Sequence, residues 1–341
     1  MPLVSIITPS YNQAAYLEHT IRSVLLQTGV EIEYCVVDGA SNDQSLAIIQ
    51  RHAGRLAWWV SEPDQGQAEA INKGLDQAQG EYVAWLNSDD LYLPGAVQKA
   101  VAAMQADPAL GLVYGDAITI DQAGRPLNRL SFGNWGLLEL LGFRIICQPA
   151  VFMRRSVLEA ALDADQAGYL DRSYHYMLDH QLWIRMARLA PIRRLPEVLA
   201  AARQHAEAKN VKQAPAFSQE IRRILEWIPT QPDLAPLYRQ NRRFIHAGAY
   251  RLQARYYLDG GQPGTALRYY AKSAVNQPNY ALKHWHRMIY ALLSLAGAKN
   301  LAERTLRPAS ARQKRHSLAS VLSTTSDLAT FQDWPGLNLN A

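Results

Sequence analysis

The sequence predicts an α/β fold in which a mostly parallel sheet is flanked by helices, followed by an all-helical C-terminal appendage. Two observations lead to this prediction. At the start of the chain, short apolar runs alternate with segments whose apolar residues recur at helical spacing, a pattern typical of a parallel sheet with helices on both faces. Beyond residue 213 only the helical spacing continues. We therefore predict one domain over residues 1–212, a helical region over 213–316 and a flexible tail over 317–341.

The predicted strands are rich in Val, Ile, Leu and aromatic residues and end at breakers such as Pro9 and Pro94. In the order of the chain they are residues 3–8, 32–37, 56–60, 82–86, 110–116, 118–120, 126–127, 146–154 and 192–199. Helices are expected at residues 16–27, 45–52, 67–77 and 96–104. A hairpin turn is expected at 121–125.

Composition limits the classes of protein that the chain can represent. With 48% apolar and 19% charged residues among 341, it has the composition of a globular protein large enough for one domain plus an appendage. No apolar run approaches the roughly 18 residues of a membrane-spanning helix, and no signal peptide is evident, so we expect a cytoplasmic location. Cys35 and Cys147 lie in apolar contexts and are expected to be buried thiols.

The net charge of +5 is unevenly distributed. Between Lys299 and His316 there are six lysines and arginines against the single acid Glu303. Such a cluster attracts nucleic acid or anionic lipid, and a solvated basic tail explains it equally well. Nothing else in the chain favours nucleic acid, so we predict no nucleic-acid partner.

Polar residues follow three successive predicted strands. They are Tyr11, Asp38 and Asp89, and the last belongs to the run Asn87-Ser88-Asp89-Asp90. Ligands bind beyond the carboxyl ends of strands in open α/β sheets, and two adjacent carboxylates suit Mg²⁺ or Mn²⁺. The alternative is an Asp pair that caps a turn or helix. No glycine-rich dinucleotide or P-loop signature is present, so a metal rather than a glycine cradle is expected to hold any nucleotide.

Four blocks, in order and spacing, resemble the inverting family 2 glycosyltransferases of the GT-A fold. The blocks are residues 4–12, 36–43, 70–75 and 86–90. The resemblance covers about residues 1–210. It implies a nucleotide-sugar half over about 1–115 and an acceptor half over about 116–212.

The resemblance also implies roles for the residues of the donor half. Pro9 and Tyr11 would line the base pocket, and Asp38 would accept a hydrogen bond from uracil N3–H. Asn87 and Ser88 would face the nucleotide.

The metal would bind Asp89, with Asp90 as second choice and His205 as a further ligand. The family usually has Asp where this chain has Asn87, which removes one negative charge from the site. Lys73 would balance the diphosphate, or it is a solvated helix lysine.

In the acceptor half, the resemblance identifies Asp179 as the base that deprotonates the acceptor hydroxyl. The alternative is an acid favoured by the dipole at a helix N-terminus. Many members carry a second acid where this chain has Leu178. The remaining donor or acceptor contacts implied are Glu62, Asp64, Gln148 and Trp183.

The helical region is expected to contain one degenerate tetratricopeptide-like helix pair around residues 257–278. The apolar helix Trp285–Leu295 precedes the basic cluster directly. That order suits an interfacial anchor on the inner face of an anionic membrane, although packing in the core explains the helix as well.

We therefore predict an inverting transferase that moves a hexose from a UDP-sugar to a hydroxyl of a saccharide or lipid-linked saccharide, in the assembly of cell-surface polysaccharide. A dTDP-deoxysugar, as in rhamnosyl transfer, is the alternative donor. A non-catalytic nucleotide-sugar-binding or scaffold protein is the alternative from another class.

Overall fold

The computed structural model describes residues 1–162, 168–204, 213–298 and 334–338. It divides the chain into two compact units. The first, the sheet unit, comprises Met1–Gly136, Ile146–His205 and Leu318–Ala341; the second, the helical unit, comprises Leu137–Ile145 and Ala206–Ser317.

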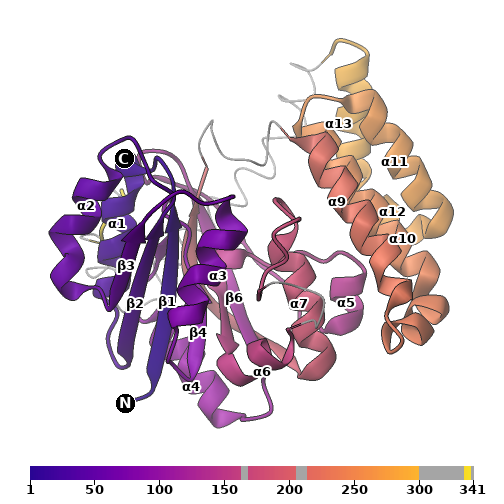
Figure 1. Cartoon of the computed structure of the whole chain (residues 1–341). Helices are drawn as coiled ribbons and strands as arrows, with labels where there is room; N and C mark the ends of the chain where they lie inside the picture. The colour runs from indigo at the N-terminus through magenta and orange to yellow at the C-terminus, as the bar shows by residue number, and fades with distance from the viewer. Residues whose placement is uncertain (163–167, 205–212, 299–333, 339–341) are drawn as a thin grey trace. The chain divides into compact units, whose positions relative to one another are not determined.

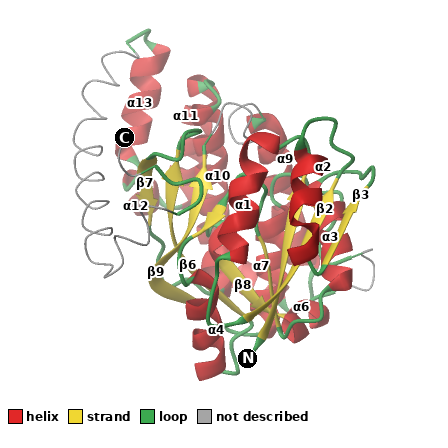
Figure 2. Ribbon diagram, turned by 90° about the vertical axis from the view of Figure 1, so that its left-hand side faces the viewer, coloured by secondary structure: helices red, strands yellow, loops and turns green. Residues whose placement is uncertain are grey.

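The sheet unit contains a mixed sheet with the strand order β3-β2-β1-β4-β8-β6-β9-β5, and β7 pairs with β6 at its side. The strands are β1 (Leu3–Ser10), β2 (Glu31–Asp38), β3 (Trp58–Ser61), β4 (Tyr82–Trp85), β5 (Leu91–Tyr92), β6 (Leu112–Ile120), β7 (Pro126–Leu130), β8 (Val151–Arg154) and β9 (Ile192–Arg203). The pairs from β3 to β4 are parallel, as the sequence predicts. Strand β8 runs antiparallel to both β4 and β6, whereas β6 and β9 are parallel. The predicted hairpin is confirmed as the antiparallel pair β6–β7 (Figure 2).

Helices cover both faces of this sheet (Figure 1). They are α1 (Ala14–Leu25), α2 (Ser45–His52), α3 (Gln67–Gln77), α4 (Ala96–Ala106), α6 (Arg155–Ala160) and α7 (Leu178–Leu189). Val4 and Ile6 of β1 belong to a core that includes residues of α1, α2 and α4. Ile7 points to the other face, where Gly74 of α3 leaves room for it; a Cβ at Gly74 would lie 2.5 Å from the Ile7 side chain. The alternation along β1 therefore places α1 and α3 on opposite faces.

The helical unit consists of α5 (Leu137–Leu141), α9 (Ala214–Trp227), α10 (Leu234–Asp259), α11 (Pro263–Asn276), α12 (Pro278–Leu282) and α13 (Trp285–Leu295). Small residues let its helices approach closely. Ala254 and Ala266 lie in the core between α10 and α11, and a Cβ at Gly248 would lie 1.9 Å from the Gly142 carbonyl oxygen. None of the helices among the described residues is long and apolar enough to cross a membrane.

The division of the chain differs from the sequence prediction at two places. Residues 137–145 belong to the helical unit, although they lie inside the predicted domain 1–212. Residues 334–338 lie in the predicted flexible tail, yet Trp334 and Leu337 are buried in the sheet unit against β5, β6 and β9. The predicted basic cluster of residues 299–316 lies outside the described residues.

Candidate functional site

The strand ends meet at one edge of the sheet. Ser10 at the end of β1 pairs with Asp38 at the end of β2, and Asp38 pairs with Ser61 at the end of β3. On the other side of β1, Ile7 pairs with Trp85, the last residue of β4. The chain segments that follow these four strands therefore start at the same edge, where ligands bind in open α/β sheets.

Asp38 is fully buried and is held by three donors. Ser41 donates its backbone N–H at 2.9 Å and its Oγ at 2.5 Å, and Ser61 Oγ donates at 2.7 Å. A carboxylate has about four acceptor positions, so one remains for a further N–H donor. This arrangement suits the predicted role of Asp38 toward a pyrimidine base.

The loops that follow β1 and β2 are tied to each other. Asn12 donates its backbone N–H to Ser41 Oγ at 2.8 Å and accepts at Oδ1 from the Asn42 backbone N–H at 2.9 Å. Asn12 and Ala40 have positive φ angles of 53° and 59°, a conformation that is costly for Ala. Beside them, Tyr11 exposes 61% of its surface, whereas Pro9 is buried in β1. Tyr11 therefore offers a face for a base, and the predicted contact of Pro9 with the base stays a prediction.

Asp64 lies beside Asp38 because residue 39 is a glycine. A Cβ at Gly39 would lie 2.8 Å from Asp64 Oδ2. Asp64 Oδ1 accepts a hydrogen bond from the Gly66 backbone N–H at 2.8 Å, and burial raises the pKa of Asp64.

Lys73 lies in an ion-pair network. Its Nζ is 2.9 Å from Glu62 and 3.3 Å from Glu69, one turn earlier on α3. The hydrogen bond to Glu62 is the main cause that raises the pKa of Lys73. Two carboxylates thus balance this charge. The predicted contact of Lys73 with the diphosphate stays a prediction.

The loop after β4 carries the predicted metal and ribose residues. Asn87 Oδ1 accepts from Gln67 Nε2 at 2.6 Å, which joins the loop to the first residue of α3. Thr20 of α1 donates its Oγ to the Ser88 and Asp90 carbonyls at 2.9 and 2.8 Å. These contacts fix the backbone of the loop, while the Ser88 side chain is itself buried.

Asp89 and Asp90 have different environments. Asp90 is buried and accepts from the Arg203 backbone N–H at 2.9 Å. Burial, and then the neighbouring charge of Asp89, raise the pKa of Asp90 well above its usual range. Asp89 is partly exposed. The partly exposed Asp89 is therefore more accessible to a hard divalent cation than the buried Asp90.

The residues around Asp89 fit a metal held jointly with a substrate and not a closed protein cage. Among the described residues, no group of three or more His, Cys, Asp or Glu side chains is arranged to hold a metal ion. Magnesium and manganese sites of nucleotide enzymes are typically completed by substrate phosphates, for which one or two carboxylates suffice. The predicted ligand His205 lies outside the described residues.

Asp179 lies in the first turn of α7 and accepts at Oδ1 from the His180 backbone N–H at 2.6 Å. One turn further, the buried ring of Trp183 stacks on Trp85 at the end of β4, with ring centroids 5.1 Å apart. Gln148 donates to the Trp85 carbonyl at 2.7 Å. Trp183 thus joins α7 to the end of β4, and Gln148 joins the turn before β8 to the same place. The predicted contacts of Trp183 and Gln148 with the substrate stay predictions.

Cys147 lies close by and is partly buried, and burial raises the pKa of its thiol. The stacking of Trp183 on Trp85 brings the N-terminal part of α7 next to the end of β4, where the loop that carries Asp89 begins.

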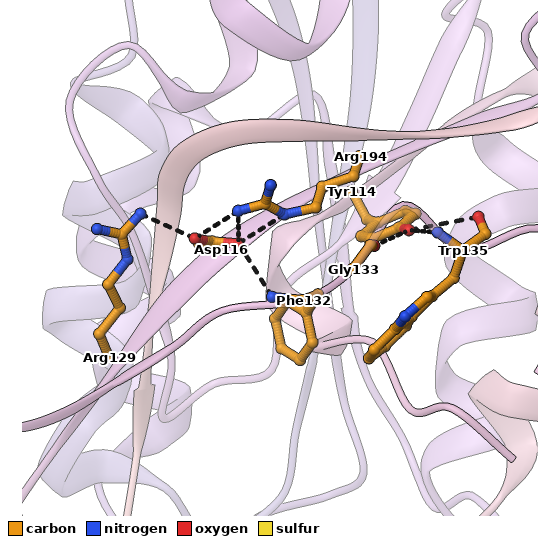
Figure 3. Close-up of polar contacts among 7 residues, drawn as sticks. All are labelled: Tyr114, Asp116, Arg129, Phe132, Gly133, Trp135 and Arg194. Atoms are coloured by element: carbon orange, nitrogen blue, oxygen red, sulfur yellow. Dashed lines mark hydrogen bonds and ion pairs between the residues drawn. The ribbon is translucent and has the colours of Figure 1, made fainter. Parts of the chain in front are cut away.

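A buried carboxylate between two arginines, which the sequence analysis did not predict, lies beside this edge. Asp116 of β6 is fully buried between Arg129 of β7 and Arg194 of β9 (Figure 3). Arg194 donates through Nε and Nη2 at 3.0 and 2.8 Å, and Arg129 through Nη2 at 2.8 Å. Phe132 adds its backbone N–H. We call Asp116, Arg129 and Arg194 the strand brace.

The position of the strand brace follows from the strand register. Met153 of β8 pairs with Val83 on one side and Leu112 on the other. Asn87 comes four residues after Val83, and Asp116 comes four residues after Leu112. Asp116 therefore lies at about the same height along the sheet as Asn87. Next to it, the Tyr114 hydroxyl donates to the Gly133 carbonyl and accepts from the Trp135 backbone N–H, both at 2.7 Å (Figure 3).

Comparison with known proteins identifies the family of the chain. The sequence model of Glycosyl transferase family 2 matches residues 5–162. An uncharacterized glycosyltransferase of Nostoc sp. is 31% identical over 228 residues, which cover 64% of this chain and 69% of that protein. The chondroitin synthase of Escherichia coli is 27% identical over 217 residues, 62% of this chain and 30% of the synthase. The matched region spans only about a third of two Rickettsia relatives.

Solved structures show the same fold. The structure of Staphylococcus aureus TarS 1–349 in complex with UDP has a TM-score of 0.58 at 19% identity and covers 91% of this chain and 92% of that one. The mannosyltransferase PcManGT of Pyrobaculum calidifontis, in complex with GDP-Man and Mn²⁺, has a TM-score of 0.53 at 19% identity, covering 87% of each chain. The chain belongs to the family 2 glycosyltransferases, and it has their GT-A fold.

Proposed function

We propose that this glycosyltransferase moves a hexose from UDP to a hydroxyl of a saccharide or lipid-linked saccharide, with inversion at the anomeric carbon, in the assembly of cell-surface polysaccharide. The observation that carries this proposal is that Tyr11, Asp38 and Asp89 stand at or just after the ends of strands that share one sheet edge, with Trp183 of α7 stacked on Trp85 at the end of β4. The complexes of TarS with UDP and of PcManGT with GDP-Man support a nucleotide-sugar donor. The likeness to chondroitin synthase supports a polysaccharide product.

The residues divide the work between donor and acceptor. The exposed ring of Tyr11 stacks on the base, and Asp38 accepts the base N–H at its remaining acceptor position. Asp179 accepts the proton of the acceptor hydroxyl while that oxygen attacks the anomeric carbon. Asp89 would hold Mn²⁺ or Mg²⁺ against the diphosphate, where the ion stabilises the negative charge of the departing group.

A thermal-shift panel tests the donor. UDP-, GDP- and dTDP-sugars are added with Mn²⁺ or with a chelator, because a ligand that binds the folded state raises its apparent stability. The proposal expects the largest shift for a UDP-sugar with Mn²⁺. A larger shift with a dTDP-sugar would favour the alternative donor, since Asp38 can meet thymine N3–H equally well. A shift confined to GDP-sugars would contradict the proposal.

We also propose that the enzyme works at an anionic membrane surface. Helix α13 exposes Trp285, Ile289, Leu292 and Leu295, by 55, 38, 54 and 60%, at spacings that place them on one face. In the sequence the basic run that begins at Lys299 follows directly. An apolar helix face beside a cluster of cations is the combination that binds the interface of an anionic bilayer.

Vesicle sedimentation tests this surface. We expect the protein to sediment with phosphatidylglycerol vesicles but not with phosphatidylcholine vesicles, and to be released by salt. The pair Trp285→Glu and Leu292→Glu should abolish sedimentation. Val275→Glu on α11, a position exposed by 76%, is the matched control and should not. Equal binding of both variants would contradict the assignment of α13.

A further inference from the structure

The C-terminal residues Trp334–Asn338 form a turn that is built into the sheet unit. Leu337 donates its backbone N–H to the Trp334 carbonyl at 3.1 Å, across Pro335 and Gly336. Gly336 has a φ of 76°, and Pro followed by a residue with positive φ is the arrangement of a type II turn. We call residues 334–338 the C-terminal clasp.

The clasp is anchored beside the loop that carries Asp89. Trp334 donates its Nε1 to the carbonyl of Tyr92 at 2.7 Å, two residues beyond Asp90. Its ring and the Leu337 side chain are buried in a cluster with residues of β5, β6 and β9 and with Leu93, which follows β5. The strand residues are Leu91, Ile118, Ile120 and Ala201. This anchoring is a specific contact, since it combines a buried aromatic ring with a satisfied polar atom.

The clasp also fits the hairpin between β6 and β7. Asn338 donates its backbone N–H to the Gly124 carbonyl at 3.0 Å. A Cβ at Gly124 would lie 2.1 Å from the Gly336 carbonyl oxygen, so the close approach requires glycine at that position. The hairpin and the clasp therefore hold each other in place.

Arg203, at the end of β9, links the clasp and the hairpin to the Asp89 loop. Its Nη1 donates to the carbonyls of Asp121 and Gln122 at 3.0 and 3.1 Å, in the hairpin. Its Nε donates to the Asp89 carbonyl at 3.0 Å, and its Nη2 lies 3.5 Å from the Gly336 carbonyl. The planar guanidinium fixes these directions relative to each other.

Two further contacts hold Arg203 itself. Its backbone N–H donates to Asp90 Oδ1 at 2.9 Å, and its guanidinium lies over the ring of Tyr16, 4.9 Å from the ring centre. Arg203 is buried, with 6% of its surface exposed. A guanidinium held in this way acts as a rigid connector.

We propose that the C-terminal clasp positions the loop that carries Asp89 for donor binding. Arg203 is the positioning residue through which the clasp acts. The carbonyl of Asp89 is held by Arg203, so the direction of the Asp89 carboxylate depends on a guanidinium that the clasp and hairpin lock. The inference rests on the proposed role of Asp89 toward the metal and diphosphate. It connects residues 334–338 to the donor site, although the family match ends at residue 162.

The test compares donor binding with and without metal. UDP affinity is measured by calorimetry in Mn²⁺ and in chelator, together with the KM for donor and for acceptor. Trp334→Ala and Arg203→Lys should each weaken UDP binding in Mn²⁺ by about tenfold, and raise the donor KM alike, while UDP affinity in chelator and the acceptor KM stay unchanged. Trp334→Phe keeps an aromatic ring but loses the N–H donor. It should therefore weaken UDP binding in Mn²⁺ by less than Trp334→Ala does.

Controls separate positioning from general loss of structure. Leu258→Ala removes core packing from the helical unit, so it should lower the melting temperature without changing UDP affinity in Mn²⁺. Equal weakening of UDP binding with and without metal in the Trp334 and Arg203 variants would overturn the inference, as would unchanged binding. Asp89→Ala distinguishes the failures: if it leaves metal-dependent binding intact, the proposed function itself is wrong at Asp89.

Discussion

Asp90 and Asp116 are both buried carboxylates of the sheet unit, yet their surroundings are opposite. Asp116 is held by two arginines and a backbone N–H. Asp90 accepts the Arg203 backbone N–H at 2.9 Å and an Asn87 side-chain N–H at 3.4 Å, and it lies next to the carboxylate of Asp89. The strand brace thus pairs the buried charge of Asp116 with two arginines, whereas burial and the charge of Asp89 favour the neutral form of Asp90. The comparison distinguishes a carboxylate that supports the fold from one whose position serves the site.

The largest effect is expected at the strand brace. Asp116→Asn leaves Arg129 and Arg194 facing each other without a carboxylate, so we expect the free energy of unfolding to fall by about 3 kcal/mol. Urea denaturation measures this change. The control is Asp107→Asn, which breaks the exposed pair with Arg193 and should cost less than about 1 kcal/mol. Equal costs for the two variants would show that Asp116 is no brace.

A smaller effect of opposite sign is expected at Asp90. A carboxyl whose pKa is higher in the folded than in the unfolded protein loses stability as pH rises above the unfolded value of about 3.9. Because burial and Asp89 raise the pKa of Asp90, Asp90→Asn should be more stable than the parent at pH 8. Asn keeps an oxygen that accepts from the Arg203 backbone N–H.

The gain from Asp90→Asn should shrink on acidification and vanish below about pH 4, where the carboxyl is protonated in both states. Melting temperatures between pH 4 and 8 test this trend. A variant less stable than the parent at pH 8 would mean that Asp90 is ionised and stabilised in the fold.

The sequence predicts those parts of the molecule that depend on local patterns, and it misses those that depend on partners distant in the chain. The parallel strands β1 to β4 and their helices were predictable because each apolar run and each helical period is local. Asp38 and Asn87 were found because they directly follow such strands. The antiparallel insertion of β8 between β4 and β6, and the placement of residues 137–145 in the helical unit, depend on partners distant in the chain.

Three residues that contact the predicted site were missed for the same reason, because their partners are distant in the chain. Gln67 is bonded to Asn87 across 20 positions, Ser61 to Asp38 across 23, and Arg203 to the Asp89 carbonyl across 114. No local pattern signals such pairs. Trp183 lies one helical turn after Asp179, and its stacking on Trp85 likewise depends on a partner distant in the chain.

The division of labour between Asp89 and Asp179 is the central claim, and one variant tests it most directly. In Asp179→Asn the transfer rate and the UDP affinity in Mn²⁺ are measured on the same preparation. We predict that transfer falls by a factor of about 10² to 10⁴, the usual contribution of a general base, while UDP affinity stays within about twofold. Unchanged transfer, or a loss of UDP binding that matches the loss of transfer, would contradict Asp179 as the base.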